Sequence, residues 1–144
     1  DGSFRGAQKL SALGINTIGI PGTIDLDIAC TDYTIGFDTA VNTAVEAIDK
    51  IKDTSMSHER CSIIEVMGRN AGWLTASAAL ARTEDCTGPD LIYLPETPFS
   101  YDKFVSDILE VKKHKSSAII ALSEGIRNAD GQGRALRPVP HSRQ

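Results

Sequence analysis

The sequence contains no run of lysine or arginine and no apolar stretch that approaches the roughly 18 residues of a membrane-spanning helix. Together with a formal net charge of −4, these absences argue against nucleic acid and membranes as partners. No signal peptide is recognisable. The three cysteines, Cys30, Cys61 and Cys86, have no C-x-x-C spacing, which favours reduced thiols and a cytoplasmic location over a disulfide-bonded secreted fold.

What is present is the composition of a globular domain. Of the 144 residues, 41% are hydrophobic and 24% are charged, which supplies enough apolar material for a core. There are no internal repeats and no low-complexity tract. The chain begins at Asp1, directly on a Gly-Ser turn and without a methionine, so we expect it to be a piece of a longer polypeptide.

Helical and strand-like patterns alternate along the chain. Apolar spacing, with Ser3 and Ser100 as caps and Gly14 as a terminator, predicts helices within residues 3–13, 37–51, 71–81 and 100–109. Short β-rich runs predict strands at residues 17–20, 61–66, 91–94 and 118–122. This alternation predicts a three-layer, Rossmann-like α/β fold in which a largely parallel sheet has helices on both faces.

The most informative segment is a polar loop near residues 20–27. Pro21 and Gly22 form a turn signal, and a hydroxyl and two carboxylates follow at alternate positions, Thr23, Asp25 and Asp27. In an extended segment these three side chains would face the same way. A carboxylate beside a hydroxyl suits a base that removes the proton from a sugar hydroxyl during phosphoryl transfer. A plain polar surface turn is the alternative interpretation.

Further polar groups follow the other predicted strands. Met67-Gly68-Arg69 follows the second strand and Glu124 follows the last. Because ligands of open parallel sheets bind beyond the carboxyl ends of the strands, we expect these loops to meet at one edge. The turn Asp1-Gly2-Ser3 opens a helix whose free N–H groups and dipole favour phosphate. The sequence therefore predicts a phosphate-handling active site.

Several motifs, in order, resemble those of the ATP-dependent 6-phosphofructokinase family. They are Asp1-Gly2-Ser3, Pro21-Gly22-Thr23-Ile24-Asp25, segment 31–40 (TDYTIGFDTA), Ser57-His58-Glu59-Arg60 and Glu65-Val66-Met67-Gly68-Arg69. The resemblance extends from Asp1 to about Arg127. It implies transfer of the γ-phosphoryl group of ATP to the 1-hydroxyl of fructose 6-phosphate, which gives fructose 1,6-bisphosphate in glycolysis. It also implies Mg²⁺ and a homo-oligomer, a tetramer in the family.

The resemblance assigns the reacting groups. Asp25 matches the general base that takes the proton from the sugar 1-hydroxyl, and Thr23 matches the hydroxyl that contacts the phosphoryl group in flight. Met67, Gly68 and Arg69 match the substrate-binding loop, where the guanidinium of Arg69 would neutralise charge on the transferring group. These residue types agree with the demands of phosphoryl transfer.

The remaining implied ligands are spread along the chain. Asp1 matches the acidic residue that holds Mg²⁺ near the ATP phosphates, and Gly2 and Ser3 line the same turn. Glu124 matches the residue that accepts hydrogen bonds from the sugar. Arg60 matches an arginine that reaches into a neighbouring subunit's site to bind the sugar 6-phosphate.

The chain also departs from the family pattern. Leu26 stands where the family usually has asparagine, and Ala29-Cys30 stands where Pro-Gly is common. The tail, residues 128–144, is atypical towards its end, and the family's N-terminal nucleotide-binding segment precedes the position of Asp1. We therefore expect residues 1–144 to be the central portion of a phosphofructokinase-like domain, inactive by itself.

The phosphoryl donor is indicated by two glycines. Pyrophosphate-dependent members of the family tend to have aspartate at the position of Gly2 and lysine at that of Gly22, whereas glycine at both positions leaves room for the nucleotide and favours ATP. Two alternatives remain open at this point: a pyrophosphate-dependent phosphofructokinase, and a catalytically silent subunit that binds sugar phosphate.

Overall fold

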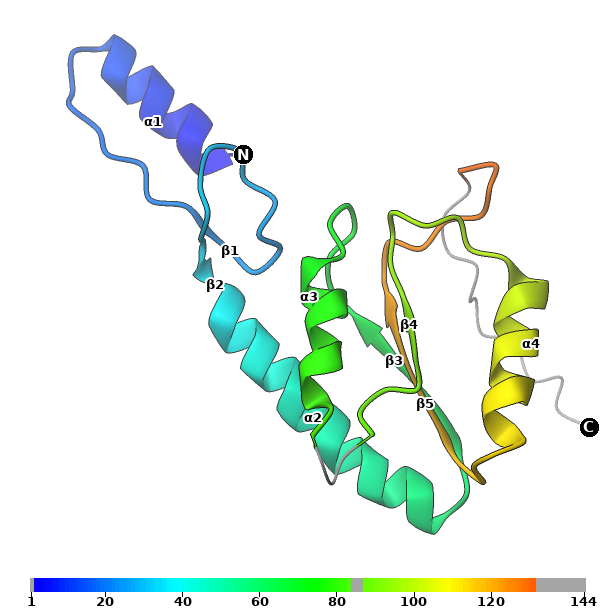
Figure 1. Cartoon of the computed structure of the whole chain (residues 1–144). Coiled ribbons are helices and arrows are strands. Elements are labelled where there is room, and N and C mark those ends of the chain that lie inside the picture. The colour runs from blue at the N-terminus through cyan, green and yellow to red at the C-terminus, as the bar shows by residue number, and fades with distance from the viewer. Residues whose placement is uncertain (1, 84–86, 132–144) are drawn as a thin grey trace, which may run out of the picture.

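The fold centres on a parallel sheet of three strands. The computed structural model describes residues 2–83 and 87–131. Strands β3 (Cys61–Val66), β5 (Ala118–Ser123) and β4 (Leu91–Tyr93) lie in the order β3-β5-β4, and both pairs are parallel (Figure 1). The predicted strands at 61–66, 91–94 and 118–122 are therefore confirmed to within one residue at each end.

Strand β5 is buried along its whole length because helices cover both faces of the sheet. Ile119 and Ala121 pack with Ile48 of α2 (Phe37–Ser57) and with the 3-10 helix η1 (Ala78–Ala81). The alternate residues Ile120 and Leu122 pack with α4 (Tyr101–Lys112) on the opposite face. Figure 1 shows α2 on one side of the sheet and α4 on the other. The three-layer arrangement agrees with the sequence prediction.

Capping and aromatic packing fix α4 against the sheet. The hydroxyl of Ser100 accepts a hydrogen bond from the backbone N–H of Lys103 at 3.4 Å, so the predicted N-cap is confirmed. Phe104 packs edge-on or tilted against Tyr93 and Phe99, with ring centroids 5.3 Å away in both cases. The aromatic contacts join α4 to β4 and to the chain that follows it.

The predicted strand at 17–20 is wrong. Residues 15–20 are irregular and exposed, and the first strand, β1 (Gly22–Thr23), begins two residues later. It pairs in parallel with a short strand that the sequence did not indicate, β2 (Ile35–Gly36), and the two form a sheet of their own. A β-rich run becomes a strand only when another strand satisfies its backbone groups, and within the described residues 17–20 has no such partner.

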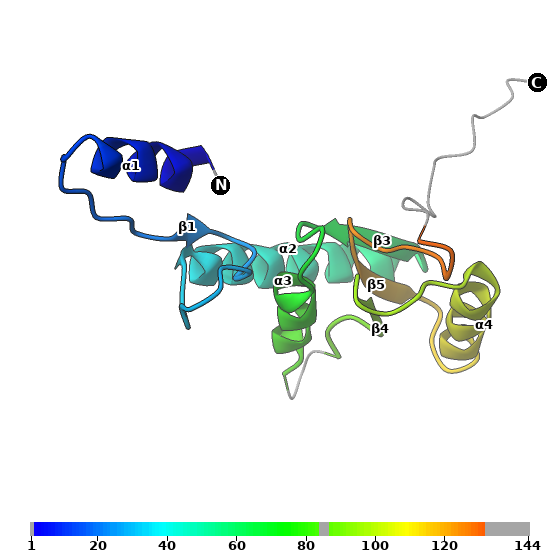
Figure 2. The same cartoon turned by 90° about the horizontal axis from the view of Figure 1, so that it is seen from above.

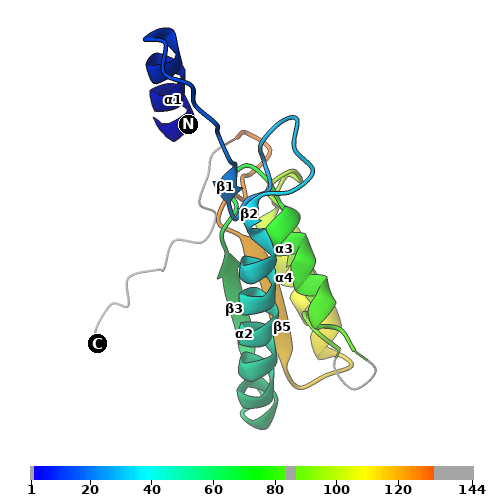
Figure 3. The same cartoon turned by 90° about the vertical axis from the view of Figure 1, so that its left-hand side faces the viewer.

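Helix α1 (Gly2–Ala12) stands apart from the sheet and from α2 in all three views (Figures 1, 2 and 3). It contains no buried residue, and large apolar side chains such as Leu10 within it and Leu13 after it are exposed. Ser3 lies inside the helix rather than at its cap. The predicted end at Gly14 is correct: its φ is +81°, and Ile15 donates its N–H to the carbonyl of Leu10 at 3.2 Å.

The alanine-rich helix predicted at 71–81 is shorter and divided. Helix α3 (Trp73–Ser77) continues into η1 (Ala78–Ala81). Gly72 precedes it, and the carboxylate of Glu96 accepts the N–H of Gly72 at 2.7 Å. Within residues 2–83 and 87–131, no helix combines the length and the apolar character that crossing a membrane would need.

Candidate active site

The loop after β1 is closed at its base by β2. The hydroxyl of Thr34, a residue only 5% exposed, donates a hydrogen bond to the carbonyl of Thr23 at 2.7 Å. The hydroxyl of Thr23 in turn accepts the backbone N–H of Asp25 at 3.2 Å. The β1–β2 pairing and these two hydrogen bonds hold the start of the loop, so Thr23 and Asp25 have a defined placement.

The geometry that brings the loop's polar groups together differs from the one expected. Residues 24 and 25 form a bend, and Leu26 has a φ of +55°. The alternation of an extended strand therefore does not apply to Thr23, Asp25 and Asp27, and the expectation that it would align them is wrong. A turn stabilised by a threonine hydroxyl takes its place.

The environment of Asp25 makes its carboxylate a stronger base than an ordinary aspartate. Partial burial raises the pKa of Asp25, and the negative charges of Asp27 and Glu124 raise it further, in that order. Glu124 lies nearly a hundred positions away in the sequence, and its effect agrees with the packing of Ile24 against the cluster that contains Val66, at the end of β3.

The loop after β3 is attached to the end of β5 through Gly68. Its N–H donates to the Oε1 atom of Glu124 at 3.2 Å, and its carbonyl accepts the hydroxyl of Ser123 at 2.6 Å. Gly68 has a φ of +118°, and a Cβ there would lie 2.5 Å from the carbonyl oxygen of Ala71. Only glycine fits this turn. The flanking side chains of Met67 and Arg69 are exposed and free to meet a ligand.

Gly125 brings the same two segments into contact a second time. A Cβ on Gly125 would overlap the carbonyl oxygen of Arg69 and would lie 2.5 Å from its carbonyl carbon. The N–H of Glu124 donates to the carbonyl of Val66 at 2.9 Å, which continues the β3–β5 pairing into the loops. Arg127 adds a hydrogen bond of 3.3 Å to the side-chain oxygen of Asn70. The Arg69 backbone is thus held on the segment that carries Glu124.

The loops after β3 and β5 therefore meet at one edge, as the sequence predicted. The strand β1 belongs to a separate sheet, and its loop is brought near this edge by Ile24, which packs against the cluster of Val41, Val66 and Leu74. In Figure 1 this is the upper edge of the sheet, towards which β3 and β5 point. The arrangement combines a basic carboxylate (Asp25), a hydroxyl (Thr23), a guanidinium (Arg69) and a second carboxylate (Glu124). Such a set can remove a proton from a hydroxyl group and neutralise a phosphoryl group.

Other sequence-predicted site residues lie elsewhere. Arg60 is at the opposite end of β3 from Met67, about 20 Å of strand away, and its carbonyl accepts the N–H of Ala118 at 3.1 Å. Gly2 and Ser3 belong to α1, which none of the described contacts joins to this edge. Asp1 and most of the atypical tail lie outside the described residues.

Two contributors, Ser123 and Gly125, were missed by the sequence analysis. They flank Glu124, and both are buried. The sequence signal that could have identified them is a pair of small residues around a polar residue at the end of a buried strand. Small side chains let a neighbouring loop approach closely.

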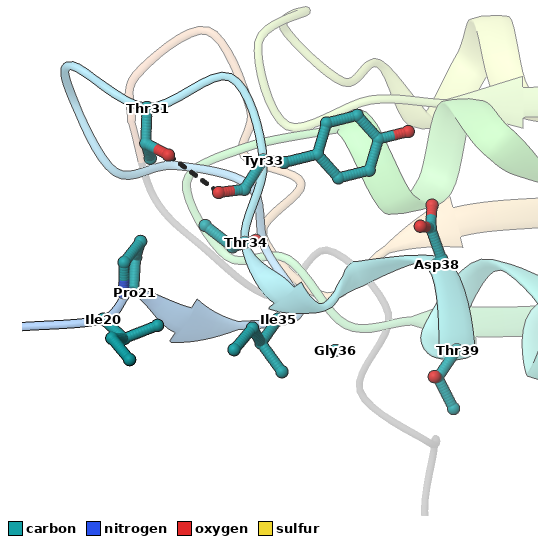
Figure 4. Close-up of a pocket in the computed structure, with 9 residues that line it drawn as sticks. All are labelled: Ile20, Pro21, Thr31, Tyr33, Thr34, Ile35, Gly36, Asp38 and Thr39. Carbon is teal, nitrogen blue, oxygen red and sulfur yellow. Dashed lines mark hydrogen bonds between the residues drawn. The ribbon is translucent and has the colours of Figure 1, made fainter.

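The loop after β1 also borders an open depression of about 490 Å³ (Figure 4). Thr31, Tyr33, Thr34, Asp38 and Thr39 contribute polar groups to it, and the hydroxyl of Thr31 donates to the carbonyl of Tyr33 at 2.8 Å. Neither Thr23 nor Asp25 lines this depression. The depression therefore does not define the site.

Two departures from the family pattern fall at left-handed backbone positions. Leu26 has a φ of +55° and Cys30 a φ of +64°. The family pattern has asparagine and glycine there, the residues that adopt this conformation at low cost, whereas other residues lose roughly 1–2 kcal/mol.

We therefore expect Cys30→Gly to stabilise the protein by about 0.5–1 kcal/mol, since relief of the backbone conformation exceeds the entropy cost of glycine. Cys61 is the matched control, because it is also an exposed free cysteine but lies in β3. Cys61→Gly should destabilise the protein by up to about 1 kcal/mol. Denaturant unfolding of both variants measures the two changes, and equal signs would contradict the interpretation.

Comparison with known proteins agrees with this geometry. The profile of the family described as Phosphofructokinase matches residues 1–142. The chain is 56% identical over 131 residues to the ATP-dependent 6-phosphofructokinase of Thermoanaerobacter sp. (strain X514), covering 90% of this chain and 39% of that protein. It is 51% identical over 140 residues to the enzyme of that name from Clostridium tetani, covering 96% of this chain and 42% of that protein.

Solved structures give the same result. A pyrophosphate-dependent phosphofructokinase from Nitrosospira multiformis superimposes with a TM-score of 0.69 at 29% identity, over 88% of this chain and 33% of that one. Phosphofructokinase from Saccharomyces cerevisiae superimposes with a TM-score of 0.70 at 30% identity, over 88% of this chain and 18% of that one.

These features define an α/β protein in which polar loops meet at the carboxyl edge of a parallel sheet. The chain belongs to the phosphofructokinase family, and the resemblance inferred from the sequence is confirmed. It spans about two fifths of the length of the curated relatives it matches.

Proposed function

We propose that the chain is the central portion of a 6-phosphofructokinase, which transfers the γ-phosphoryl group of ATP to the 1-hydroxyl of fructose 6-phosphate. One observation carries the proposal: Glu124 accepts the N–H of Gly68, which joins the loops after β3 and β5, while Ile24 packs the loop after β1 against the cluster that contains Val66 at the end of β3. By itself the chain should be inactive, because the nucleotide site needs groups beyond the residues described.

In this proposal each group at the edge has one task. Asp25 takes the proton of the sugar 1-hydroxyl, and its raised pKa makes it a better acceptor. Arg69 neutralises charge on the transferring phosphoryl group, and the hydroxyl of Thr23 contacts that group. Met67 contacts the sugar, and Glu124 accepts hydrogen bonds from its hydroxyl groups. Attack by the resulting alkoxide on the γ-phosphorus releases ADP.

Mg²⁺ would shield the phosphate charges when it is bound with ATP. Among the described residues, no group of three histidine, cysteine, aspartate or glutamate side chains is placed to hold a metal ion. Magnesium in kinases is often held by one or two carboxylates together with the substrate phosphates. A single carboxylate beside the nucleotide therefore suffices, and we propose Asp1, which lies outside the described residues, for that task.

The donor is proposed to be ATP because the fold itself does not require glycine at Gly2 or Gly22. A Cβ at Gly2 would meet no atom within 4 Å, and one at Gly22 would meet only the carbonyl of Ile35 at 4.0 Å. Neither has a positive φ. Space for a nucleotide is therefore the reason left for glycine at these two positions. The curated relatives at 51–56% identity are named as ATP-dependent, which supports the same choice.

Parallel assays with fructose 6-phosphate and Mg²⁺ test this proposal. They use the intact protein, which here means the longer polypeptide proposed to contain residues 1–144. We expect turnover with ATP and little with pyrophosphate. The double substitution Gly2→Asp with Gly22→Lys should depress ATP use, because a carboxylate would repel the α-phosphate. A preference of the unmodified protein for pyrophosphate would overturn the donor assignment and leave the sugar site standing. Absence of turnover with either donor would favour a silent sugar-phosphate-binding subunit.

Arg60 is proposed to bind the sugar 6-phosphate in a neighbouring subunit, since it lies too far along β3 to serve the site of its own chain. We expect Arg60→Ala to raise the KM for fructose 6-phosphate at least about tenfold, the effect of losing one charge-assisted hydrogen bond. The KM for ATP should change far less. Lys50, an exposed cation paired with Glu46 on the same helix, supplies the control Lys50→Ala. An active monomer in sedimentation, or equal effects on both substrates, would refute the assignment.

A further inference from the structure

The end of β5 carries a buried hydroxyl whose position is unusual. Ser123 is fully buried and is the last residue of the strand, paired in register with Val66 of β3. Its hydroxyl donates to the carbonyl of Gly68 at 2.6 Å and accepts the N–H of Gly125 at 3.0 Å. One side chain therefore bridges the loop after β3 and the segment after β5.

Gly68 is held at both of its polar backbone atoms by consecutive residues. Ser123 binds its carbonyl, and Glu124 binds its N–H. These two hydrogen bonds fix the peptide planes on both sides of Gly68. The planes in turn set the directions in which the exposed side chains of Met67 and Arg69 leave the loop.

We propose that Ser123 is a positioning residue for the sugar-phosphate side of the site. It locks the Met67–Arg69 loop onto the residue that carries the sugar-binding carboxylate, so that Arg69 and Glu124 keep a fixed separation. This inference rests on the proposed function. It assigns Ser123 no contact with substrate, because the side chain is fully buried.

The consequence of losing the hydroxyl is selective. Ser123→Ala leaves the carbonyl of Gly68 buried without this donor, and such a loss weakens the loop by an amount comparable with one unsatisfied hydrogen bond. We expect the KM for fructose 6-phosphate to rise about tenfold, whereas the KM for ATP should stay within about twofold. Ser123→Thr keeps the hydroxyl and should restore most of the lost affinity.

Ser55 provides a matched control. It is also a buried serine, 2% exposed, and its hydroxyl shares a 2.5 Å hydrogen bond with that of Ser62 near the other end of β3. Ser55→Ala should lower the thermal unfolding temperature as Ser123→Ala does, yet change neither KM. If Ser55→Ala raises the KM for fructose 6-phosphate as much as Ser123→Ala, or if Ser123→Ala affects both substrates equally, the proposal is overturned.

A second measurement does not depend on catalysis. Amide hydrogen exchange at Gly68 in the intact protein should accelerate at least about tenfold in Ser123→Ala and stay near the unmodified rate in Ser55→Ala. Ser123→Cys, which keeps the size but weakens the donor, should give an intermediate rate and replaces Ser123→Ala if that variant does not fold. Unchanged amide exchange at Gly68 in Ser123→Ala and in Ser123→Cys overturns the inference. Absence of turnover in the unmodified protein overturns the proposed function alone, because the exchange rates still decide the role of Ser123.

Discussion

Replacement of Asp25 by asparagine in the intact protein is expected to lower kcat by roughly 10² to 10⁴-fold, with a modest change in either KM. Asparagine keeps the shape and the hydrogen-bonding reach of aspartate but cannot accept the proton of the sugar hydroxyl. Steady-state kinetics with ATP and fructose 6-phosphate measure the change. Asp32→Asn is the control, because Asp32 is exposed in the same loop and should leave kcat within about twofold of the unmodified value. Near-normal turnover of Asp25→Asn would remove Asp25 from the role of base.

The raised pKa of Asp25 adds a pH dependence to this expectation. The base works as a carboxylate, so kcat should fall as the pH drops through the folded-state pKa of Asp25. This acid limb of the pH profile of kcat should lie at a higher pH than it would for an ordinary aspartate. Asp27→Asn removes one of the charges that raise this pKa and should move the limb to lower pH. A limb that does not move would mean that another group controls the profile.

The same shift has a consequence for stability. A carboxyl group with a higher pKa in the folded state favours folding when it is protonated. Its contribution is complete below the unfolded-state pKa and is lost as the pH rises through the folded-state pKa. At neutral pH, Asp25→Asn should therefore stabilise the fold while it abolishes most of the turnover. Opposite effects on activity and stability distinguish a catalytic base from a residue that holds the loop together.

Substitution of Gly125 by alanine should lower both the stability and the activity of the protein. The added Cβ overlaps the backbone of Arg69, which cannot move aside as a flexible side chain could. We expect the free energy of unfolding to fall by at least about 2 kcal/mol. The displacement of the Arg69 loop should also lower kcat/KM for fructose 6-phosphate by roughly 10²-fold. Denaturant unfolding and steady-state kinetics measure the two effects.

Gly6 supplies the opposite case. It lies inside α1, and a Cβ there would meet no atom within 4 Å. Gly6→Ala should therefore stabilise the protein by about 0.5–1 kcal/mol and leave kinetics unchanged. If Gly125→Ala is tolerated as well as Gly6→Ala, the contact between Gly125 and Arg69 does not hold the loop.

The features that the sequence determined are those that depend on residues close together in the chain. The runs at 61–66 and 118–122 are strands, Ser100 caps α4, and Gly14 ends α1, because spacing and capping chemistry act over a few residues. The placement of polar groups after β3 and β5 was also sufficient to predict that these two loops meet, whereas β1 lies in a separate sheet. Parallel strands bring their carboxyl ends to the same edge, whatever the order of the strands.

Tertiary structure decided what depends on residues far apart. The expected strand at 17–20 failed because strand formation needs a partner, and β2, from residues 35 and 36, pairs instead with residues 22 and 23. Glu124 adds to the rise in the pKa of Asp25, after burial and Asp27, and Ser123 holds the loop at Gly68. Ser123 and Glu124 lie more than fifty positions from Gly68 and Asp25. Their effects therefore appear only when the folded chain brings these residues together.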